Sequence, residues 1–149
     1  MLPNQMTIVQ ETWRQVVPIA DNAASLFYDR LFEIDPSIRR LFAGVDMESQ
    51  GRKLVQALAT FIDALEHIET LVPKLRSLGQ RHVGYGVTDA HYDTVGAALL
   101  WTLEKGLGDV WTADAKAAWT AAYTLVADVM RTAASETNRH QVRQLSASA

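Results

Sequence analysis

His82 is the side chain of this sequence whose type and neighbours most suggest chemistry. It lies in the stretch LVPKLRSLGQRHVGYGV, residues 71–87. Read as a helix that begins at the proline, this stretch places Leu75, Leu78 and His82 on one apolar face, because they are spaced i, i+3 and i+7. The glycines of GYG predict that the helix ends directly after the histidine. Such an imidazole is either a core histidine bonded to a backbone carbonyl or a ligand of a flat, apolar group that rests on the leucines.

If His82 is a ligand, the lack of a second histidine beside it favours haem over a free metal ion. One imidazole is not enough to bind a free metal ion, but it is enough for haem, because the porphyrin supplies four nitrogens and the protein adds only an axial ligand. The other histidines form no paired-ligand motif: His67 lies beside two glutamates, His91 begins a predicted helix, and His140 belongs to a polar tail. The sequence contains no HExxH pair, glycine-rich phosphate loop or GxSxG elbow. The residues alone leave a core histidine and a haem ligand both open.

The composition excludes several other classes of function. With 149 residues, of which 48% are hydrophobic and 21% charged, the chain can form one domain with a sizeable core. A net charge of −3 without a dense basic patch argues against nucleic-acid binding, which needs clustered Lys and Arg. Cysteine is absent, which excludes disulfides, iron–sulfur clusters and thiolate zinc sites. The opening MLPNQMTIVQETW lacks the features of a secretory signal, and no apolar run is long enough for a membrane span, so a cytoplasmic protein is expected.

Helical periodicity covers almost the whole chain, and no convincing alternating strand interrupts it. Helices are expected from a cap at Thr7, from Pro18 to about Ile34, from Pro36, from Ser49, from Pro73, from Thr88 or Asp89, and from a cap at Thr112 to about Ala134. The sequence therefore predicts one all-α domain of six to eight helices over residues 1–135. Residues 136–149 form a polar tail that is expected to be poorly ordered.

Several spaced motifs make the chain resemble the globin family, in particular bacterial single-domain haemoglobins and the haem domain of flavohaemoglobins. The motifs are LFYDRLFEIDPSIRRLF, SQGRKL, LGQRHVGYGV, HYDTVGAALL and AAWTAAY, in this order within about residues 6 to 134. The family pattern has a proline six residues before a haem-packing phenylalanine, matched by Pro36 and Phe42. Its proximal histidine is matched by His82. The resemblance implies a globin fold around one haem b, with His82 as the axial ligand of the iron.

On the ligand side of the haem, the resemblance implies a pocket formed by Tyr28, Gln50 and Leu54. Gln50 and Leu54 are four residues apart and therefore share one helix face. By resemblance they lie over the haem, and Tyr28 fills the distal tyrosine position. A phenol in a dry pocket stabilises the partial negative charge of bound dioxygen, and Gln50 can also donate or can orient the phenol. Without the resemblance, Tyr28 and Leu54 are read as core residues and Gln50 as an exposed residue at a helix start.

On the proximal side, the resemblance includes one departure from the flavohaemoglobin pattern. Tyr92, ten residues after His82, matches a tyrosine that holds the proximal histidine together with a glutamate. The glutamate position falls on Ala134, and Glu136 would point to another side of the helix. A carboxylate on the histidine N–H pushes electron density onto the iron, so its loss favours gas binding over oxygen activation. The other haem contacts implied by the resemblance are apolar packing by Val87 and Val95 and propionate contacts by Lys53 and Tyr85.

Together these residues imply reversible dioxygen binding for storage or delivery, with tight binding and slow release. Carbon monoxide and nitric oxide are further haem ligands that the resemblance implies, and no residue is assigned a catalytic role. The chain ends where the flavin and nicotinamide reductase of a flavohaemoglobin would begin. Nitric oxide dioxygenation with a separate reductase is therefore the first alternative, followed by a gas sensor that acts through a partner and by a helical module without haem. A monomer or homodimer that binds neither nucleic acid nor membrane is expected.

Overall fold

A computed structural model describes the backbone of residues 1–148 and the side chains of residues 1–139. Every regular element in this part of the chain is helical, which confirms the all-α prediction. The elements are α1 Pro3–Val16, η1 Val17–Ile19, α2 Ala20–Ile34, η2 Pro36–Phe42, α3 Met47–Asp63, η3 Leu65–Thr70, α4 Val72–Gly84, α5 Asp89–Leu107, η4 Gly108–Val110 and α6 Ala113–Ser148, where η denotes a 3₁₀ segment. Over the same residues, no helix is both long and apolar enough to cross a membrane.

Local signals explain where most of the helices begin and end. Thr112 caps α6, because its hydroxyl accepts a hydrogen bond of 3.1 Å from the Ala115 N–H. Helix α5 ends at Leu107, and the next residue, Gly108, has a φ of 55°, a conformation that glycine adopts readily. The predicted cap at Thr7 is wrong, since α1 already begins at Pro3. Proline suits a first helical position because the N–H that it lacks would have no partner there.

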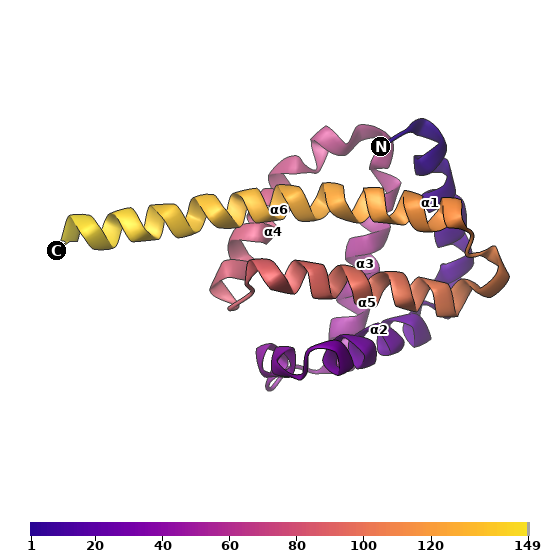
Figure 1. Ribbon diagram of the computed structural model, residues 1–149, viewed down its shortest axis with the longest axis horizontal. Coiled ribbons are helices and arrows are strands. Elements are labelled where there is room, and N and C mark those ends of the chain that lie inside the picture. Colours follow the sequence, from indigo (N-terminus) through magenta and orange to yellow (C-terminus); the bar gives the residue numbers. More distant parts are fainter. Residues whose placement is uncertain (149) are drawn as a thin grey trace.

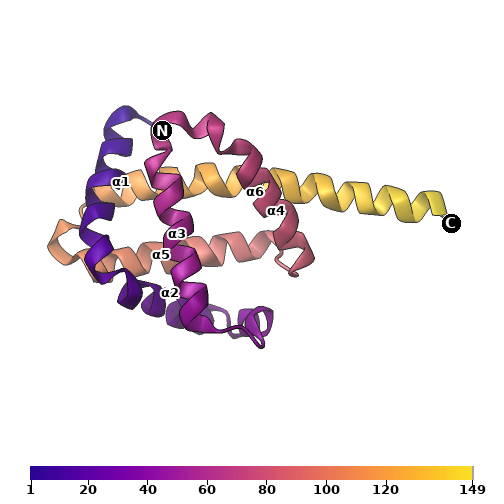
Figure 2. The same ribbon diagram turned by 180° about the vertical axis from the view of Figure 1, so that it is seen from behind.

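The helices pack in crossed layers around the longest one. Figures 1 and 2 show α5 and α6 running side by side, with α1 and α3 crossing both of them and α2 lying on the side of α5 that faces away from α6. Helix α1 packs on α6, α2 packs on α5 and α3 packs on α2, while α4 makes its extensive contacts with α6. Helix α3 and helix α4 therefore pack on different helices.

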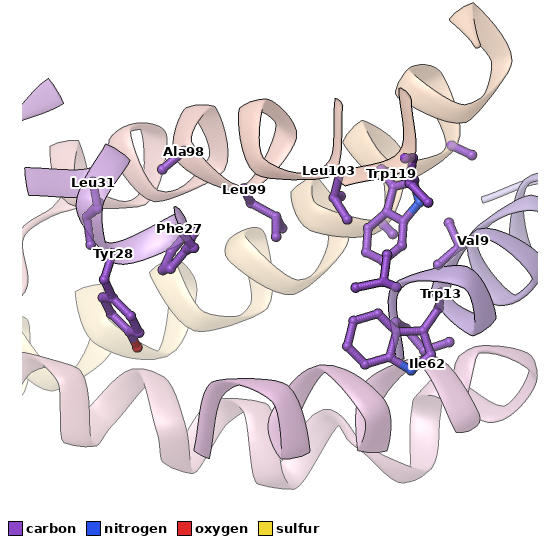
Figure 3. Close-up of a cluster of buried hydrophobic side chains, with 14 of the residues drawn as sticks. Val9, Trp13, Phe27, Tyr28, Leu31, Ile62, Ala98, Leu99, Leu103 and Trp119 are labelled. Atoms are coloured by element: carbon purple, nitrogen blue, oxygen red, sulfur yellow. The ribbon is translucent and has the colours of Figure 1, made fainter. Parts of the chain in front are cut away.

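The main hydrophobic core joins side chains from α1, α2, α3, α5 and α6. Ten of its buried residues are labelled in Figure 3: Val9, Trp13, Phe27, Tyr28, Leu31, Ile62, Ala98, Leu99, Leu103 and Trp119. Tyr28 belongs to this core, and its hydroxyl lies at the edge that faces α3 (Figure 3). A second, smaller cluster fills the space between α4, α5 and α6.

One buried hydrogen bond in the main core leads to a stability prediction. The Trp119 Nε1–H donates to the Thr12 hydroxyl over 2.8 Å, and both residues are buried. We expect Thr12→Val to lower the free energy of unfolding by about 1–3 kcal/mol, because the indole N–H then remains buried without an acceptor. Urea unfolding measures the change. Thr60→Val is the matched control, since the hydroxyls of Thr12 and Thr60 both donate to the backbone carbonyl four residues earlier, but Thr60 is exposed and accepts no bond from an indole. Equal stability of the two variants would contradict the prediction.

Helix α6 is longer than the sequence analysis expects. It continues without a break from Ala113 to Ser148, so the predicted end at about Ala134 is wrong and the backbone of residues 136–148 is helical. The reason is that no glycine or proline occurs within this range, and a polar segment joined to an established helix needs no new nucleus. Figure 1 shows the last turns projecting beyond the other helices.

Candidate haem site

His82 lies near the end of α4 and is half-buried. Its Nδ1 is 2.6 Å from the Leu78 carbonyl oxygen, one turn earlier, so the Nδ1–H donates to this carbonyl. Such a bond fixes the tautomer and leaves the lone pair on Nε2, which makes no hydrogen bond within the described residues. A bond from the second ring nitrogen to a backbone carbonyl is typical of histidines that ligate metals. The geometry thus combines the carbonyl bond of a core histidine with a free Nε2.

Burial keeps this imidazole neutral. The pKa of His82 is lowered, mainly because burial disfavours the charged form; the Leu78 carbonyl acts in the opposite direction and the Arg81 charge adds to the lowering. A neutral imidazole is the form that ligates a metal. The protonation state and the tautomer of His82 therefore both suit axial ligation.

Tyr28 and Gln50, which are separated by 22 residues in the chain, come together between α2 and α3. The Gln50 Nε2–H donates to the Tyr28 hydroxyl oxygen over 3.1 Å. Because the phenol oxygen already accepts this bond, its own proton remains available to another acceptor. Burial raises the pKa of Tyr28, against a smaller opposite effect of the Gln50 bond, so the phenol stays protonated and remains a donor. These two residues form a ready-made donor pair.

Aromatic rings hold the Tyr28 side chain in place. The Tyr28 ring centroid is 4.9 Å from that of Phe27 and 5.4 Å from that of Phe42, both in edge-to-face arrangements. Phe42 is half-buried at the end of η2 and also packs edge-on against Phe32 at 5.7 Å. Such pairs favour one ring orientation. The phenol ring is therefore fixed from several sides, and Tyr28 is only 7% exposed.

Leu54 and the remaining predicted haem contacts occupy different environments. Leu54 is half-buried beside Phe27 and borders an apolar cavity of about 30 Å³. Val95 is half-buried against the main core, and Val87 against the second cluster. Lys53 and Tyr85 are exposed, and the Tyr85 ring lies 5.8 Å from the His82 ring. These last two side chains are free to reach a charged group at the protein surface.

Tyr92 occupies the second cluster without a hydrogen-bond partner for its side chain among the described residues. It is only 7% exposed, and its hydroxyl is buried. Glu136 is not its partner, because this carboxylate forms an ion pair with Arg76 of α4. The arrangement agrees with the expectation that Glu136 points away from Tyr92, and Ala134 supplies no carboxylate.

The residues fit a flat, apolar prosthetic group. Helix α3, which carries Gln50 and Leu54, and helix α4, which carries His82, pack on different helices and make no extensive contact with each other. Large apolar side chains of η2, α3, α4 and α5 are only half-buried: Leu41, Phe42, Leu54, Leu58, Phe61, Leu78 and Val95. Within residues 1–139, no cluster of three His, Cys, Asp or Glu could hold a bare metal ion. One free imidazole nitrogen among apolar side chains matches the needs of haem.

Gly79 positions the helix of His82, and its role is not predicted from the sequence. An ideal Cβ on Gly79 would lie 2.5 Å from the Met130 carbonyl oxygen and 2.8 Å from the Met130 Cα, so only glycine lets α4 approach α6 this closely. Gly79 is one turn before His82 on the same helix. An isolated glycine inside a helical pattern is the signal that points to such a contact.

Comparison with known proteins identifies the class. The chain matches the globin family model over residues 25–130, and it therefore belongs to the globin family. It is 29% identical over 132 residues to an anaerobic nitrite reductase of Oryza sativa subsp. indica. The matched region covers 85% of this chain and 91% of that relative. It is 30% identical over 131 residues to a flavohemoprotein of Xylella fastidiosa strain 9a5c, and 28% identical over 131 residues to a flavohemoprotein of Bacillus subtilis strain 168. The matches cover 87% and 86% of this chain but span only 33% of each flavohemoprotein.

Proposed function

We propose that the protein binds haem b through Nε2 of His82 and holds dioxygen reversibly between the iron and the Tyr28–Gln50 pair. The hydrogen bond from Gln50 to Tyr28 carries this proposal. When bound, ferrous haem supplies an iron atom with one open position for a diatomic gas. The chain supplies the axial imidazole on one side and an oriented phenol donor on the other.

The distal residues act by hydrogen bonding and by excluding water. Gln50 donates to the Tyr28 oxygen, so the phenol proton is directed to a gas that carries partial negative charge. Burial strengthens this bond because the local dielectric constant is low. Phe42 and Leu54 narrow the pocket and keep water away from it. Tight binding with slow release of dioxygen follows from this combination.

The proximal residues hold the haem in place. His82 binds with a neutral imidazole whose tautomer the Leu78 carbonyl fixes. We assign apolar haem packing to Val87 and Val95, and propionate contacts to exposed Lys53 and Tyr85. Tyr92 lies in the cluster behind the histidine helix, where no described carboxylate bonds to its hydroxyl. Because a carbonyl and not a carboxylate accepts the His82 Nδ1–H, the proximal push onto the iron is weak, which supports a gas-binding role. We further propose a cytoplasmic monomer or homodimer that also binds carbon monoxide and nitric oxide.

Replacement of Tyr28 by phenylalanine tests the proposal. We expect dioxygen to leave the Tyr28→Phe protein about 10- to 100-fold faster, because a hydrogen bond to a charged group contributes about 1.5–3 kcal/mol. Flash photolysis and stopped-flow mixing measure the rate. Tyr123→Phe is the matched control, since Tyr123 of α6 is half-buried, its hydroxyl donates to the Tyr92 carbonyl oxygen, and it lies outside the proposed ligand pocket. Identical dissociation rates in both variants would refute the role of Tyr28.

A second candidate function is a haem enzyme that acts on nitrogen oxides with electrons from a separate reductase. The similarity to a protein named anaerobic nitrite reductase, over 91% of that protein's length, favours this candidate. Nitric oxide dioxygenation and nitrite reduction both fall within it. Steady-state turnover with a supplied reductase separates the two functions: sustained consumption of nitric oxide or nitrite at a rate limited by the haem protein would favour the enzyme.

A further inference from the structure

Arg131 of α6 contacts the first turns of α5 through two ion pairs and an aromatic ring. Its side chain is 28% exposed, and its Nε lies 3.2 Å from a carboxylate oxygen of Asp89. Its Nη2 forms a second ion pair with Asp93, one helical turn further on. The guanidinium carbon also lies 5.4 Å from the centroid of the Tyr92 ring. One side chain thus contacts three residues on a single face of α5.

Two residues hold the backbone and the ring of His82. The Leu78 carbonyl accepts the bond from the imidazole, and the Val87 N–H donates to the His82 carbonyl oxygen over 3.0 Å. Both Leu78 and Val87 pack against the second cluster, of which Tyr92 is a buried member. The Tyr92 ring lies against the Arg131 guanidinium. It therefore belongs to the same hydrophobic cluster as Leu78 and Val87, the two residues that bond to His82.

The chain provides a second connection between Arg131 and His82. Val87 is only two residues before Asp89, the first residue of α5. The Tyr92 ring has no hydrogen bond of its own to fix it, since no described residue bonds to its hydroxyl. Its backbone carbonyl accepts a bond from the Tyr123 hydroxyl of α6. Its position therefore depends on packing and on contacts from α6, among which Arg131 supplies the charged one.

We propose that Arg131 is a positioning residue for His82: its contacts with Asp89, Asp93 and Tyr92 hold Leu78 and Val87 where they keep the imidazole in one orientation. Only the effect of this orientation on the bond between His82 and the haem iron rests on the proposed function. The orientation itself is a property of the chain without haem. Arg131 is connected to His82 in two ways, through the short segment from Val87 to Asp89 and through the second cluster.

The first test uses the haem-free protein. Nitrogen-15 NMR of the imidazole measures which ring nitrogen carries the proton in wild type, Arg131→Met, Arg131→Lys and Asp93→Asn. We expect wild type to show the Nδ1–H form, Arg131→Met to lose this dominance, and Asp93→Asn, which removes one ion pair, to show a smaller loss. Arg131→Lys should recover part of the wild-type signal because it keeps the charge. If Arg131→Met does not fold, Asp93→Asn carries the test.

Arg30→Met is the matched control. Arg30 also combines an ion pair, to Glu33 at 3.2 Å, with a ring contact, to Trp101 at 4.9 Å, but it lies on α2. The same tautomer populations in Arg30→Met, Asp93→Asn and Arg131→Met would overturn the proposal.

A second test uses the haem-loaded protein. The iron–histidine stretching frequency of the ferrous form, measured by resonance Raman spectroscopy, should broaden and shift in Arg131→Met and not in Arg30→Met. An unchanged band in Arg131→Met would also overturn the proposal. If wild-type protein takes up no haem, the proposed function fails, while the NMR comparison still decides the role of Arg131.

Discussion

Replacement of His82 by alanine is expected to abolish axial ligation of haem while the helices remain folded. Loss of a group that only orients a metal ligand lowers metal affinity by about 10- to 100-fold, so loss of the ligand itself should lower haem affinity by more than about 100-fold. The fold should persist because His82 is only half-buried and makes one local bond within its own helix. Haem titration of the haem-free protein and the visible spectrum of the ferrous form measure the effect.

Two further measurements make the His82 prediction specific. Added imidazole should restore the ferrous spectrum of His82→Ala, because a free imidazole can occupy the space that the side chain leaves. His67→Ala is the control, since His67 is exposed in η3, and it should bind haem like the wild type. Undiminished haem affinity and an unchanged spectrum in His82→Ala would show that His82 is a core histidine without a ligand role.

Replacement of Gly79 by alanine is expected to destabilise the protein by about 1–3 kcal/mol. Two effects oppose each other at this position. Alanine favours a helix by about 1 kcal/mol over glycine, but its Cβ would lie 2.5 Å from the Met130 carbonyl oxygen. The steric effect wins because the neighbour is backbone and cannot rotate away, so α4 must move off α6. His82 moves with α4, and the ferrous haem spectrum should therefore change as well.

Gly84→Ala is the control for the Gly79 prediction. Gly84 is the last residue of the same helix, and an ideal Cβ there meets no atom within 4 Å. The free energy of unfolding of Gly84→Ala should stay at the wild-type value or rise by up to about 1 kcal/mol, because alanine favours a helix over glycine. Urea unfolding of both variants measures the difference, and equal stabilities would show that α4 and α6 can separate without loss of packing.

The sequence predicts most of the fold because the signals for helices are local. Apolar spacing, the Thr112 cap and the break at Gly108 depend only on neighbours in the chain, and the structure confirms them. The end of α6 could not be predicted in the same way. A polar segment without glycine or proline is compatible with a helix or with a loose tail, and its composition does not decide between them.

Less of the candidate site than of the fold can be predicted from local sequence patterns. The apolar face around His82 follows from spacing, but the residues alone do not pair Tyr28 with Gln50, since only the fold brings α2 and α3 together. The resemblance to globins supplied this pair. Gly79 and Arg131 were missed because their partners lie 51 residues later and 38 residues earlier in the chain, beyond the range of any periodic pattern. Contacts of this kind depend on how helices cross, which no single helix encodes.

The length of α6 has a mechanical consequence. At a rise of about 1.5 Å per residue, its 36 residues form a rod of about 54 Å. The ion pairs of this rod with Arg76 and with Asp89 and Asp93, and its close approach to Gly79, all fall within residues 130–136, near the point where it leaves the body. That segment is a fulcrum. A sideways load on the projecting end therefore reaches this segment first, and through it α4, which carries His82 near its end.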